Sequence, residues 1–195
     1  MNPPSEGANA LQSAGKYTYA DSKAWPETER WELIGGEAFA MSPAPTRLHQ
    51  RIVSLLMTKL GAWFADKPCQ PLVSPLDVFL PEGEEALNEV STVVQPDLVV
   101  VCDEAKLIDE GVRGAPDLVI EVLSPSTAYR DFTDKRALYE KHGVREFWVV
   151  NPVTLEVTAW NLDHGSFGLP RPGLLRAGLE VLIFPGLTLR VTEKL

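Results

Sequence analysis

Several features that define other protein classes are scarce or absent in this chain of 195 residues. It has only two cysteines, Cys69 and Cys102, whose spacing fits neither a metal-binding motif nor a disulfide framework, so both are expected to be reduced thiols. No apolar run approaches the roughly 20 residues that a membrane-spanning helix needs, and no basic segment followed by an apolar one opens the chain. The sequence therefore predicts a protein without a membrane span or a secretory signal, located in the cytoplasm.

Basic residues are also in short supply. The chain has 18 Lys and Arg residues against 27 Asp and Glu residues, which gives a formal net charge of −9. This charge disfavours broad, non-specific binding to nucleic acid, so a contact with DNA must be local, assisted by a metal ion or made by a partner. We expect residues 1–24, which are polar and lack periodicity, to be a flexible arm, and residues 25–195 to be a single domain with one core.

Residues 115–152 form the most informative stretch of the chain. Val, Ile and Leu fill most positions from Asp117 to Ser124, which predicts a strand that is buried on both faces. Glu121 interrupts this strand, and a buried carboxylate needs a partner, a metal ion or a proton. Because side chains alternate along a strand, Asp117 and Glu121 are expected on the same face.

A helix is predicted over residues 128–142, with Gly143 ending it. Helical spacing gives a buried side and an exposed side. The expected buried side has Ala128, Phe132, Lys135, Leu138, Tyr139 and His142, and the mostly exposed side has Asp131, Asp134, Arg136 and Glu140. Residues 146–150 are the next strand, and a strand–helix–strand unit of this length predicts a right-handed crossover between parallel strands.

The N-terminal half is expected to begin with a hairpin over residues 31–41, which turns at Gly35-Gly36 and carries Glu32 and Glu37. Glu37 is interpreted as an acid beside the turn, with an approach to a functional site as the alternative. A helix over residues 47–65 follows, with Thr46 as its N-cap. His49 extends the buried face of this helix at its first turn, where packing or capping is the commoner role of a histidine.

Further strands complete the predicted fold. Residues 71–80 and 92–102 each read as one strand, and Asp97 shares a face with Val99 and Val101 in the second. Short strands are predicted after residue 152, at 155–160, 179–184 and 187–191, and are assigned to sheet extension or dimer contacts. The pattern as a whole indicates an α/β (α+β) fold with a parallel or mixed sheet.

Two acids on neighbouring core strands, followed by a lysine, make a minimal site for cutting a phosphodiester bond with Mg²⁺. Carboxylate oxygens hold the ion, and an ammonium group orients the nucleophile or stabilises the developing charge. Asp97, Glu121 and Lys135 fit these roles. A purely structural ion pair between Glu121 and Lys135 is the alternative interpretation.

Six motifs occur in a characteristic order: WELIGGE, RLHQRIV, VVQPDLVVV, GAPDLVIEVLSPST, YEKHGVREFWVVNP and FPGLTL. In these motifs, residues 31–189 resemble the family named "putative restriction endonuclease" within the PD-(D/E)XK nuclease superfamily. The resemblance implies a restriction-endonuclease-like core, in which helices flank a mixed central sheet, with an N-terminal hairpin and extra C-terminal strands. It also implies a divalent-metal site at one edge of the sheet.

The resemblance also assigns roles to individual residues. Asp97 of QPD and Glu121 of IEV match the family's acids, whereas Leu123 stands where the superfamily usually has its lysine. In this family the lysine lies on the following helix, which matches Lys135. His49 matches a variable position on the first helix and is given an auxiliary catalytic role. Asp117 repeats a Pro-Asp pair and competes with Asp97 as a metal ligand.

The function implied by this resemblance is a DNA endonuclease that depends on Mg²⁺ or Mn²⁺ and uses no organic cofactor. A homodimer is expected, because two sites related by two-fold symmetry cut both strands of a duplex most easily. The alternative is a non-catalytic protein that keeps the nuclease fold as a binding module, which would agree with the acidic net charge.

Overall fold

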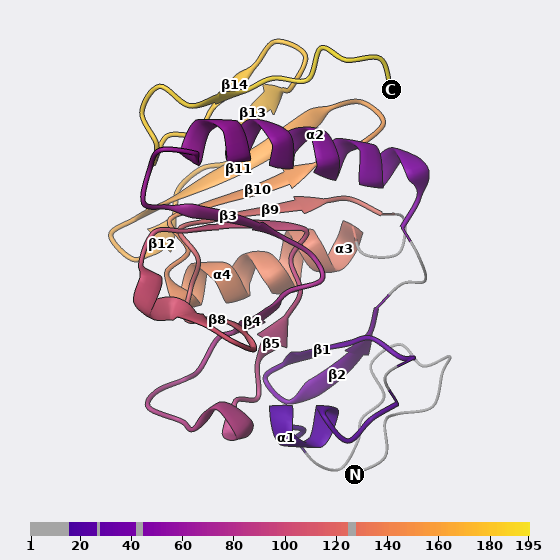
Figure 1. Ribbon diagram of the computed structural model, residues 1–195, viewed down its shortest axis with the longest axis vertical. Coiled ribbons are helices and arrows are strands. Elements are labelled where there is room, and N and C mark those ends of the chain that lie inside the picture. Colours follow the sequence, from indigo (N-terminus) through magenta and orange to yellow (C-terminus); the bar gives the residue numbers. More distant parts are fainter. Residues whose placement is uncertain (1–15, 27, 42–44, 125–127) are drawn as a thin grey trace.

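The computed structural model of the protein describes residues 16–26, 28–41, 45–124 and 128–195. Two mixed sheets, with helices packed against them, form the body of the molecule (Figure 1). The seven-stranded sheet has the order β12 (Ser166–Phe167), β11 (Glu156–Asp163), β10 (Glu146–Val150), β9 (Leu118–Val122), β6 (Leu98–Val101) and β3 (Gln70–Val73), and β13 (Arg171–Leu174) also pairs with β11. This architecture confirms the predicted α/β (α+β) class with a mixed sheet.

The second sheet has six strands and begins with the predicted hairpin. Its order is β2 (Glu37–Ala40), β1 (Trp31–Ile34), β5 (Val93–Val94), β4 (Asp77–Phe79), β8 (Gly111–Arg113) and β7 (Leu107–Ile108). Near the C-terminus, β14 (Leu179–Glu180) and β15 (Thr188–Leu189) pair with each other. The helical segments are α1 (Tyr19–Ser22), α2 (Arg47–Phe64), α3 (Ala128–Arg130) and α4 (Arg136–His142), with a π-helical turn over Asp131–Lys135 and short 3₁₀ turns at Leu87–Glu89 and Glu104–Lys106.

The predicted crossover unit is present. Strands β9 and β10 are parallel and in a register that pairs Glu121 with Val149, and the helical run from α3 to α4 connects them. Gly143 ends α4 in a left-handed conformation, with φ at 87°, which glycine adopts without steric cost. The predicted N-cap of α2 is also observed, because the Thr46 side chain accepts a hydrogen bond from the His49 main-chain N–H.

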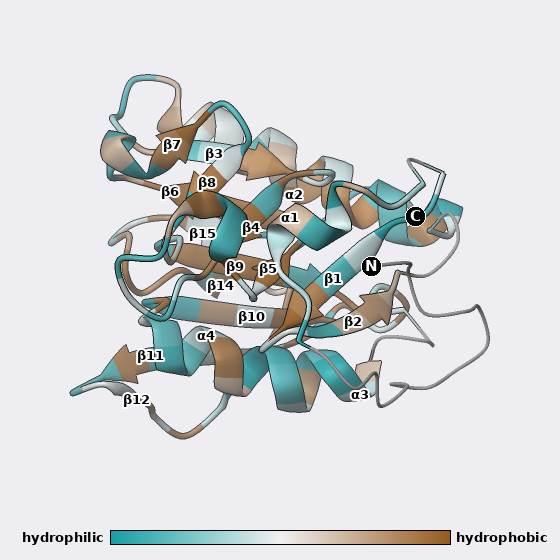
Figure 2. Ribbon diagram, turned by 90° about the horizontal axis from the view of Figure 1, so that it is seen from below, coloured by the Kyte–Doolittle hydropathy of each residue, from teal (hydrophilic) through white to brown (hydrophobic). Residues whose placement is uncertain are grey.

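The seven-stranded sheet separates two hydrophobic cores. Alternate residues of β9 face opposite sides, so Leu118 and Ile120 pack with α2 while Val119 packs with Tyr139 of α4. In Figure 1, α2 and the C-terminal segments lie on one side of this sheet and α3 and α4 on the other. In Figure 2, hydrophobic residues are frequent in the central strands, whereas α4 alternates between hydrophobic and hydrophilic residues.

Two of the predicted strands are wrong in extent, because each is divided between the two sheets. The segment 71–80 contains β3 of the seven-stranded sheet and β4 of the six-stranded sheet, and the segment 92–102 contains β5 and β6 in the same way. Pro75 and Pro96 lie in the breaks, where a residue without an N–H cannot continue a ladder. The chain therefore passes from one sheet to the other once at each of these two positions.

The packed structure begins before residue 25. Tyr17 and Trp25 are buried and cluster with Leu33, Phe79 and Val90, and the main-chain N–H of Tyr17 donates to the carbonyl of Gly36. Residues 1–15 of the expected arm lie outside the described residues. Among the described residues, no helix combines the length and the apolar character that a membrane crossing requires.

Candidate active site

Glu121 lies near the C-terminal end of β9, on the face that packs against α4. Its side chain is buried, and its Oε1 accepts hydrogen bonds from Lys135 Nζ at 3.0 Å and from the Tyr139 hydroxyl at 2.8 Å. Helical spacing predicted the inward direction of Lys135 correctly, because one helical turn separates it from Tyr139 on the same side. A buried carboxylate and an ammonium group thus meet between the sheet and the helix.

Lys135 contacts two further carboxylates. Its Nζ lies 2.8 Å from Oε1 of Glu32 and 3.9 Å from Oδ1 of Asp131, and the Lys135 side chain is only 5% exposed. Glu32 comes from β1 of the other sheet, and its Oε1 also accepts the main-chain N–H of Gln95 at 2.9 Å. The lysine therefore joins the crossover helix, β9 and the N-terminal hairpin.

The position of Asp131 differs from the expectation. Regular α-helical spacing placed it on the exposed side, whereas it is 2% exposed in the structure. Asp131 and Lys135 are the first and last residues of the π-helical turn, in which hydrogen bonds run from i to i+5 and widen the helix. The wider turn brings Asp131 to the buried side together with Lys135 and leaves Phe132, which was expected there, 39% exposed.

Asp97 and His49 complete the cluster. Strands β6 and β9 are antiparallel with Leu98 opposite Ile120, so Asp97, just before β6, lies at the same sheet end as Glu121. Asp97 Oδ2 accepts the Val122 main-chain N–H at 2.8 Å and lies 3.2 Å from His49 Nε2. The Asp97 side chain is 20% exposed, whereas that of Glu121 is 5% exposed, so the cluster is more open to solvent at Asp97.

The electrostatics of the cluster follow from burial and from its excess of carboxylates. Burial raises the pKa of Glu121 to about 8; Lys135 opposes this rise, and the acids Asp131, Asp97 and Glu32 add to it. Burial alone would lower the pKa of Lys135, but Glu121, Glu32 and Asp131 outweigh it, so the pKa lies above its ordinary value. The ammonium group therefore stays protonated at neutral pH.

His49 and Tyr139 also have shifted pKa values. Burial by itself would lower the pKa of His49, but the hydrogen bond and the negative charge of Asp97 outweigh it, and the pKa is raised. Burial, followed by the charges of Glu121 and Glu32, raises the pKa of Tyr139 well above its ordinary value. Tyr139 thus keeps its proton and remains a hydrogen-bond donor to Glu121.

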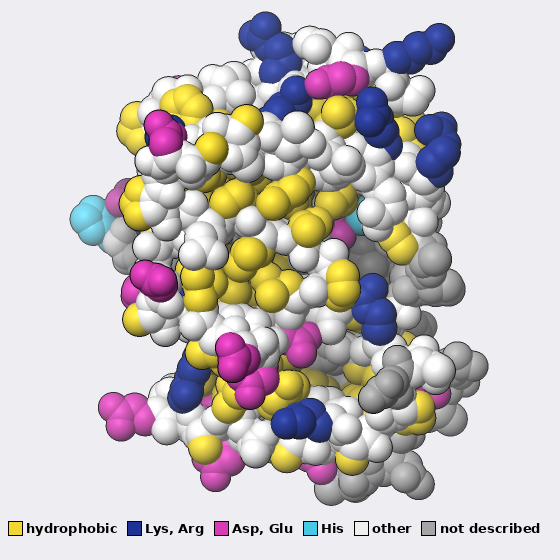
Figure 3. All heavy atoms as spheres, viewed as in Figure 1, with side chains coloured by type: hydrophobic (Ala, Val, Ile, Leu, Met, Phe, Trp, Pro, Cys, Tyr) yellow, Lys and Arg dark blue, Asp and Glu magenta, His cyan; other side chains and the backbone are white. Residues whose placement is uncertain are grey.

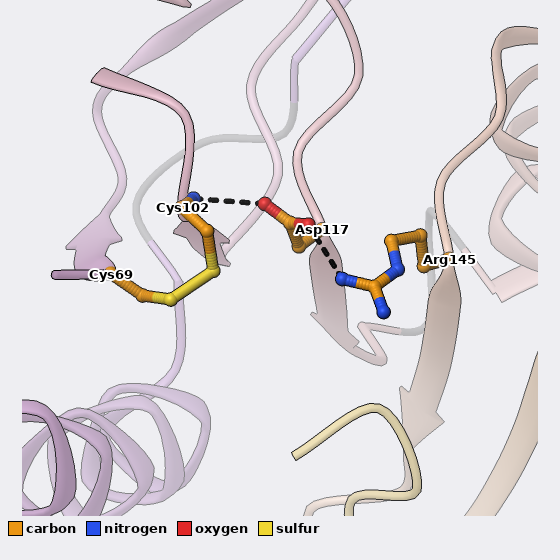
Figure 4. Close-up of a disulfide and its surroundings, with 4 residues drawn as sticks. All are labelled: Cys69, Cys102, Asp117 and Arg145. Carbon is orange, nitrogen blue, oxygen red and sulfur yellow. Dashed lines mark hydrogen bonds and ion pairs between the residues drawn. A yellow bond between two sulfur atoms is a disulfide. The ribbon is translucent and has the colours of Figure 1, made fainter. Parts of the chain in front are cut away.

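The structure does not bring Asp117 to this cluster. Asp117 and Glu121 share a face of the strand, but four residues of a strand span about 13 Å. Asp117 Oδ1 lies 3.0 Å from the Arg145 guanidinium, and Oδ2 accepts the main-chain N–H of Cys102 at 2.8 Å (Figure 4). The expectation that Asp117 competes with Asp97 as a ligand at this site therefore finds no support in the geometry.

The cysteines next to Asp117 form a disulfide, so the prediction of two reduced thiols is wrong for this structure (Figure 4). The reason is the pairing of β3 with β6. Gln70 lies opposite Val101 in this antiparallel pair, which places Cys69 opposite Cys102 one position further out. A sequence separation of 33 residues gave no sign of this register.

Three residues of the cluster were missed as site residues: Glu32, Asp131 and Tyr139. Tyr139 had a usable signal, because it follows Lys135 by one helical turn on the predicted buried side. Glu32 and Glu37 were both recognised on the hairpin, and the structure buries Glu32 and exposes Glu37. Alternation along the hairpin strands could separate Glu32 from Glu37, but it could not tell which of the two faces of the hairpin turns toward the site.

The donor atoms of the cluster are of a kind that fits a divalent ion. Among the described residues, no three His, Cys, Asp or Glu side chains converge as a ready-made metal site. The donors nevertheless suit Mg²⁺ or Mn²⁺, because they are carboxylate oxygens, and Mg²⁺ commonly uses only one or two of them. Three buried acids, Glu32, Glu121 and Asp131, surround the single buried ammonium of Lys135, so the cluster can accept more positive charge.

Comparison with known proteins identifies the family of this chain. Residues 19–192 match the family Uma2, described as "putative restriction endonuclease". The chain belongs to the Uma2 family. A search of curated proteins found no match.

A solved structure shares the fold of this Uma2 chain. It is the crystal structure of a protein from Anabaena variabilis described as a putative nuclease belonging to DUF820. The two chains are 19% identical, the similarity covers 80% of this chain and 83% of the other, and the TM-score is 0.61. At this identity the likeness shows that the fold is shared, which confirms the predicted nuclease-like architecture.

Proposed function

We propose that this protein is a nuclease that hydrolyses phosphodiester bonds in DNA with the help of Mg²⁺ or Mn²⁺. The observation that carries the proposal is the buried contact of Lys135 with Glu121 and Glu32 beside Asp97 at one end of the sheet. Membership of a family described as "putative restriction endonuclease" supports it, as does the shared fold with a protein described as a "putative nuclease".

In this proposal, Asp97 and Glu121 hold the divalent ion. Glu121 Oε1 is engaged by Lys135 and Tyr139, and Asp97 Oδ2 by His49 and the Val122 N–H, so these contacts would hold the two carboxylates in place for the ion. A bound ion of this kind lowers the pKa of a water ligand and neutralises charge on a phosphate.

Lys135 acts as a fixed positive charge. Its raised pKa keeps it protonated, so it donates hydrogen bonds and stabilises negative charge and does not accept the proton of the attacking water. Glu32 and Tyr139 are positioning residues, because Glu32 holds the ammonium and Tyr139 holds Glu121. His49 is auxiliary and fixes the carboxylate of Asp97.

Incubation of supercoiled plasmid with Mg²⁺, Mn²⁺ or EDTA tests the proposal. The intact protein should nick or linearise the plasmid with a divalent ion and leave it unchanged in EDTA. Asp97→Asn should abolish cleavage, whereas Asp117→Asn, which makes the same change at the other end of the sheet, should retain activity in the folded fraction. Loss of activity in the second variant alone, or cleavage that persists in EDTA, would contradict the assignment.

A non-catalytic binding module is the second candidate. The observation that favours it is that the ammonium group of Lys135 already contacts Glu32, Glu121 and Asp131 and so supplies positive charge to them without an added ion. Calorimetric titration with Mn²⁺ separates the two: heat of binding that Asp97→Asn removes supports the nuclease, and the absence of binding supports the module.

We also propose that the active form is a homodimer, which sedimentation at several concentrations tests.

A further inference from the structure

The charges of this chain are unevenly distributed along the sequence. Helix α2 and residues 168–195 contain seven of the 18 Lys and Arg residues but only two of the 27 Asp and Glu residues. The rest of the chain therefore has 11 basic residues against 25 acidic ones. The net charge of −9 consequently conceals a positive region.

These two segments lie together in the fold. Leu56 and Leu60 of α2 share a hydrophobic core with Val181 and Leu189, and Phe64 stacks edge-on against Phe184. Figure 3 shows Lys and Arg side chains gathered over the upper part of the molecule, where α2 and the C-terminal segment lie, and Asp and Glu side chains gathered mainly over the lower part. We call the exposed cations of these segments the basic surface: Arg47, Arg51, Arg176, Arg190 and Lys194.

Most of this surface is not neutralised by neighbouring acids. Glu193 is engaged by Lys59 at 2.8 Å, so it is not available to balance the exposed cations. Neither Arg47 nor Arg51 forms an ion pair with another described residue. Because they are four positions apart on α2, their side chains lie next to each other on its outer face.

One end of the basic surface adjoins the candidate active site. Arg47 and Arg51 flank His49 in the sequence, and His49 contacts Asp97 from the inner face of the same helix turn. A strand whose phosphate reaches Asp97 would therefore continue past the first turns of α2. The acidic lower part of the molecule offers no comparable attraction for a polyanion.

We infer that the basic surface binds the phosphodiester backbone of the nucleic-acid substrate, with Arg47 and Arg51 holding the part next to the cleaved bond. This inference rests on the proposed nuclease function. Phosphate contacts of this kind fix the orientation of a nucleic acid without reading its sequence. Binding should accordingly depend strongly on salt and only weakly on sequence.

Fluorescence anisotropy with a labelled DNA duplex tests the inference over a range of salt concentrations, in Ca²⁺ and separately in EDTA. The double variant Arg47→Ala/Arg51→Ala should bind at least ten times more weakly than the intact protein. The slope of log affinity against log salt should become shallower by about 2, roughly one for each contact removed. In a cleavage assay the same variant should raise KM much more than it lowers kcat.

The matched control is Lys16→Ala/Lys23→Ala, which changes the net charge equally at exposed positions outside α2 and residues 168–195. It should bind like the intact protein. Equal affinity in the arginine variant and the intact protein would overturn the inference, as would an equal loss in the lysine control.

The outcomes also separate this inference from the proposed function. If the intact protein cleaves DNA and the arginine substitutions have no effect, the role of the basic surface is refuted and the nuclease function stands. If binding depends on the arginines but no metal ion supports cleavage, the role of the basic surface stands and the nuclease function is refuted. An intact protein that binds no nucleic acid at all would overturn both.

Discussion

Replacing Glu121 with Gln is expected to make the folded protein more stable above neutral pH. Burial raises the pKa of Glu121 from its ordinary value of 4.5 to about 8. In the unfolded chain the carboxyl group ionises near the ordinary value. Between about pH 5 and 8 the folded state therefore keeps a proton that the unfolded state has lost, and the free energy of unfolding falls as the pH rises.

The size of this fall follows from the two pKa values. While the group is protonated in the folded state and ionised in the unfolded state, each pH unit lowers the free energy of unfolding by about 1.4 kcal/mol. Over the interval from pH 5 to pH 8, Glu121 alone contributes roughly 3–4 kcal/mol. For a protein of this length that corresponds to a change in Tm of roughly 10 °C.

The other shifted groups act in identifiable pH ranges. The raised pKa of Lys135 stabilises the fold fully below the pKa of an unfolded lysine, about 10.4, and this effect is lost only at higher pH. The raised pKa of His49 adds a fall in stability above about pH 6.5, and the lowered pKa of His142 adds a rise near the same pH. The free energy of unfolding of Glu121→Gln, subtracted from that of the intact protein at each pH, gives the contribution of Glu121 alone.

Urea unfolding followed by tryptophan fluorescence, in EDTA at pH 5, 6, 7 and 8, provides the measurement. The amide oxygen of the introduced glutamine can still accept from Lys135 and Tyr139, so the variant should fold and should lose most of the decline in stability. Glu140→Gln makes the same change on the partly exposed side of α4 and should keep the profile of the intact protein. Parallel profiles for the intact protein and Glu121→Gln would refute the reasoning.

Three further predictions concern the supports of the site and the fold. Lys135→Met removes the only buried cation among three buried carboxylates and should lower the free energy of unfolding by about 3–5 kcal/mol, whereas an unchanged urea midpoint would contradict the charge cluster. Replacing Cys69 and Cys102 together with Ser should lower it by about 2–4 kcal/mol in a urea titration without reductant; free thiols in the unreduced intact protein would show that the disulfide does not form. Thr46→Ala removes the N-cap of α2 and should cost about 1 kcal/mol, with Thr58→Ala on the exposed face as the control for the lost hydroxyl.

Local sequence patterns predicted the part of the site that lies within one crossover unit. The buried strand with Glu121, the inward Lys135 and the stop at Gly143 all follow from alternation, helical spacing and glycine's freedom in a left-handed conformation. These features depend on neighbouring residues along the chain, so one sequence is enough to find them.

The remaining features depend on longer-range packing or on departures from regular geometry. Asp131 was missed because a π-helical turn changes the helical spacing, and Glu32 because its partner lies in another sheet. Asp117 was placed on the correct face of the strand, but the shared face does not show how far Asp117 lies from Glu121 along the strand. The disulfide required the register of β3 against β6, which local sequence patterns did not reveal.

The most direct test of the proposed site is metal-dependent plasmid cleavage by Glu121→Gln, compared with the intact protein at pH 8. In EDTA at this pH the variant is predicted to be the more stable of the two, and tryptophan fluorescence of both proteins in the assay buffer checks that each is folded. The site assignment predicts cleavage by the intact protein with Mg²⁺ or Mn²⁺ and none by the variant. Cleavage by a folded Glu121→Gln variant at the rate of the intact protein would contradict it.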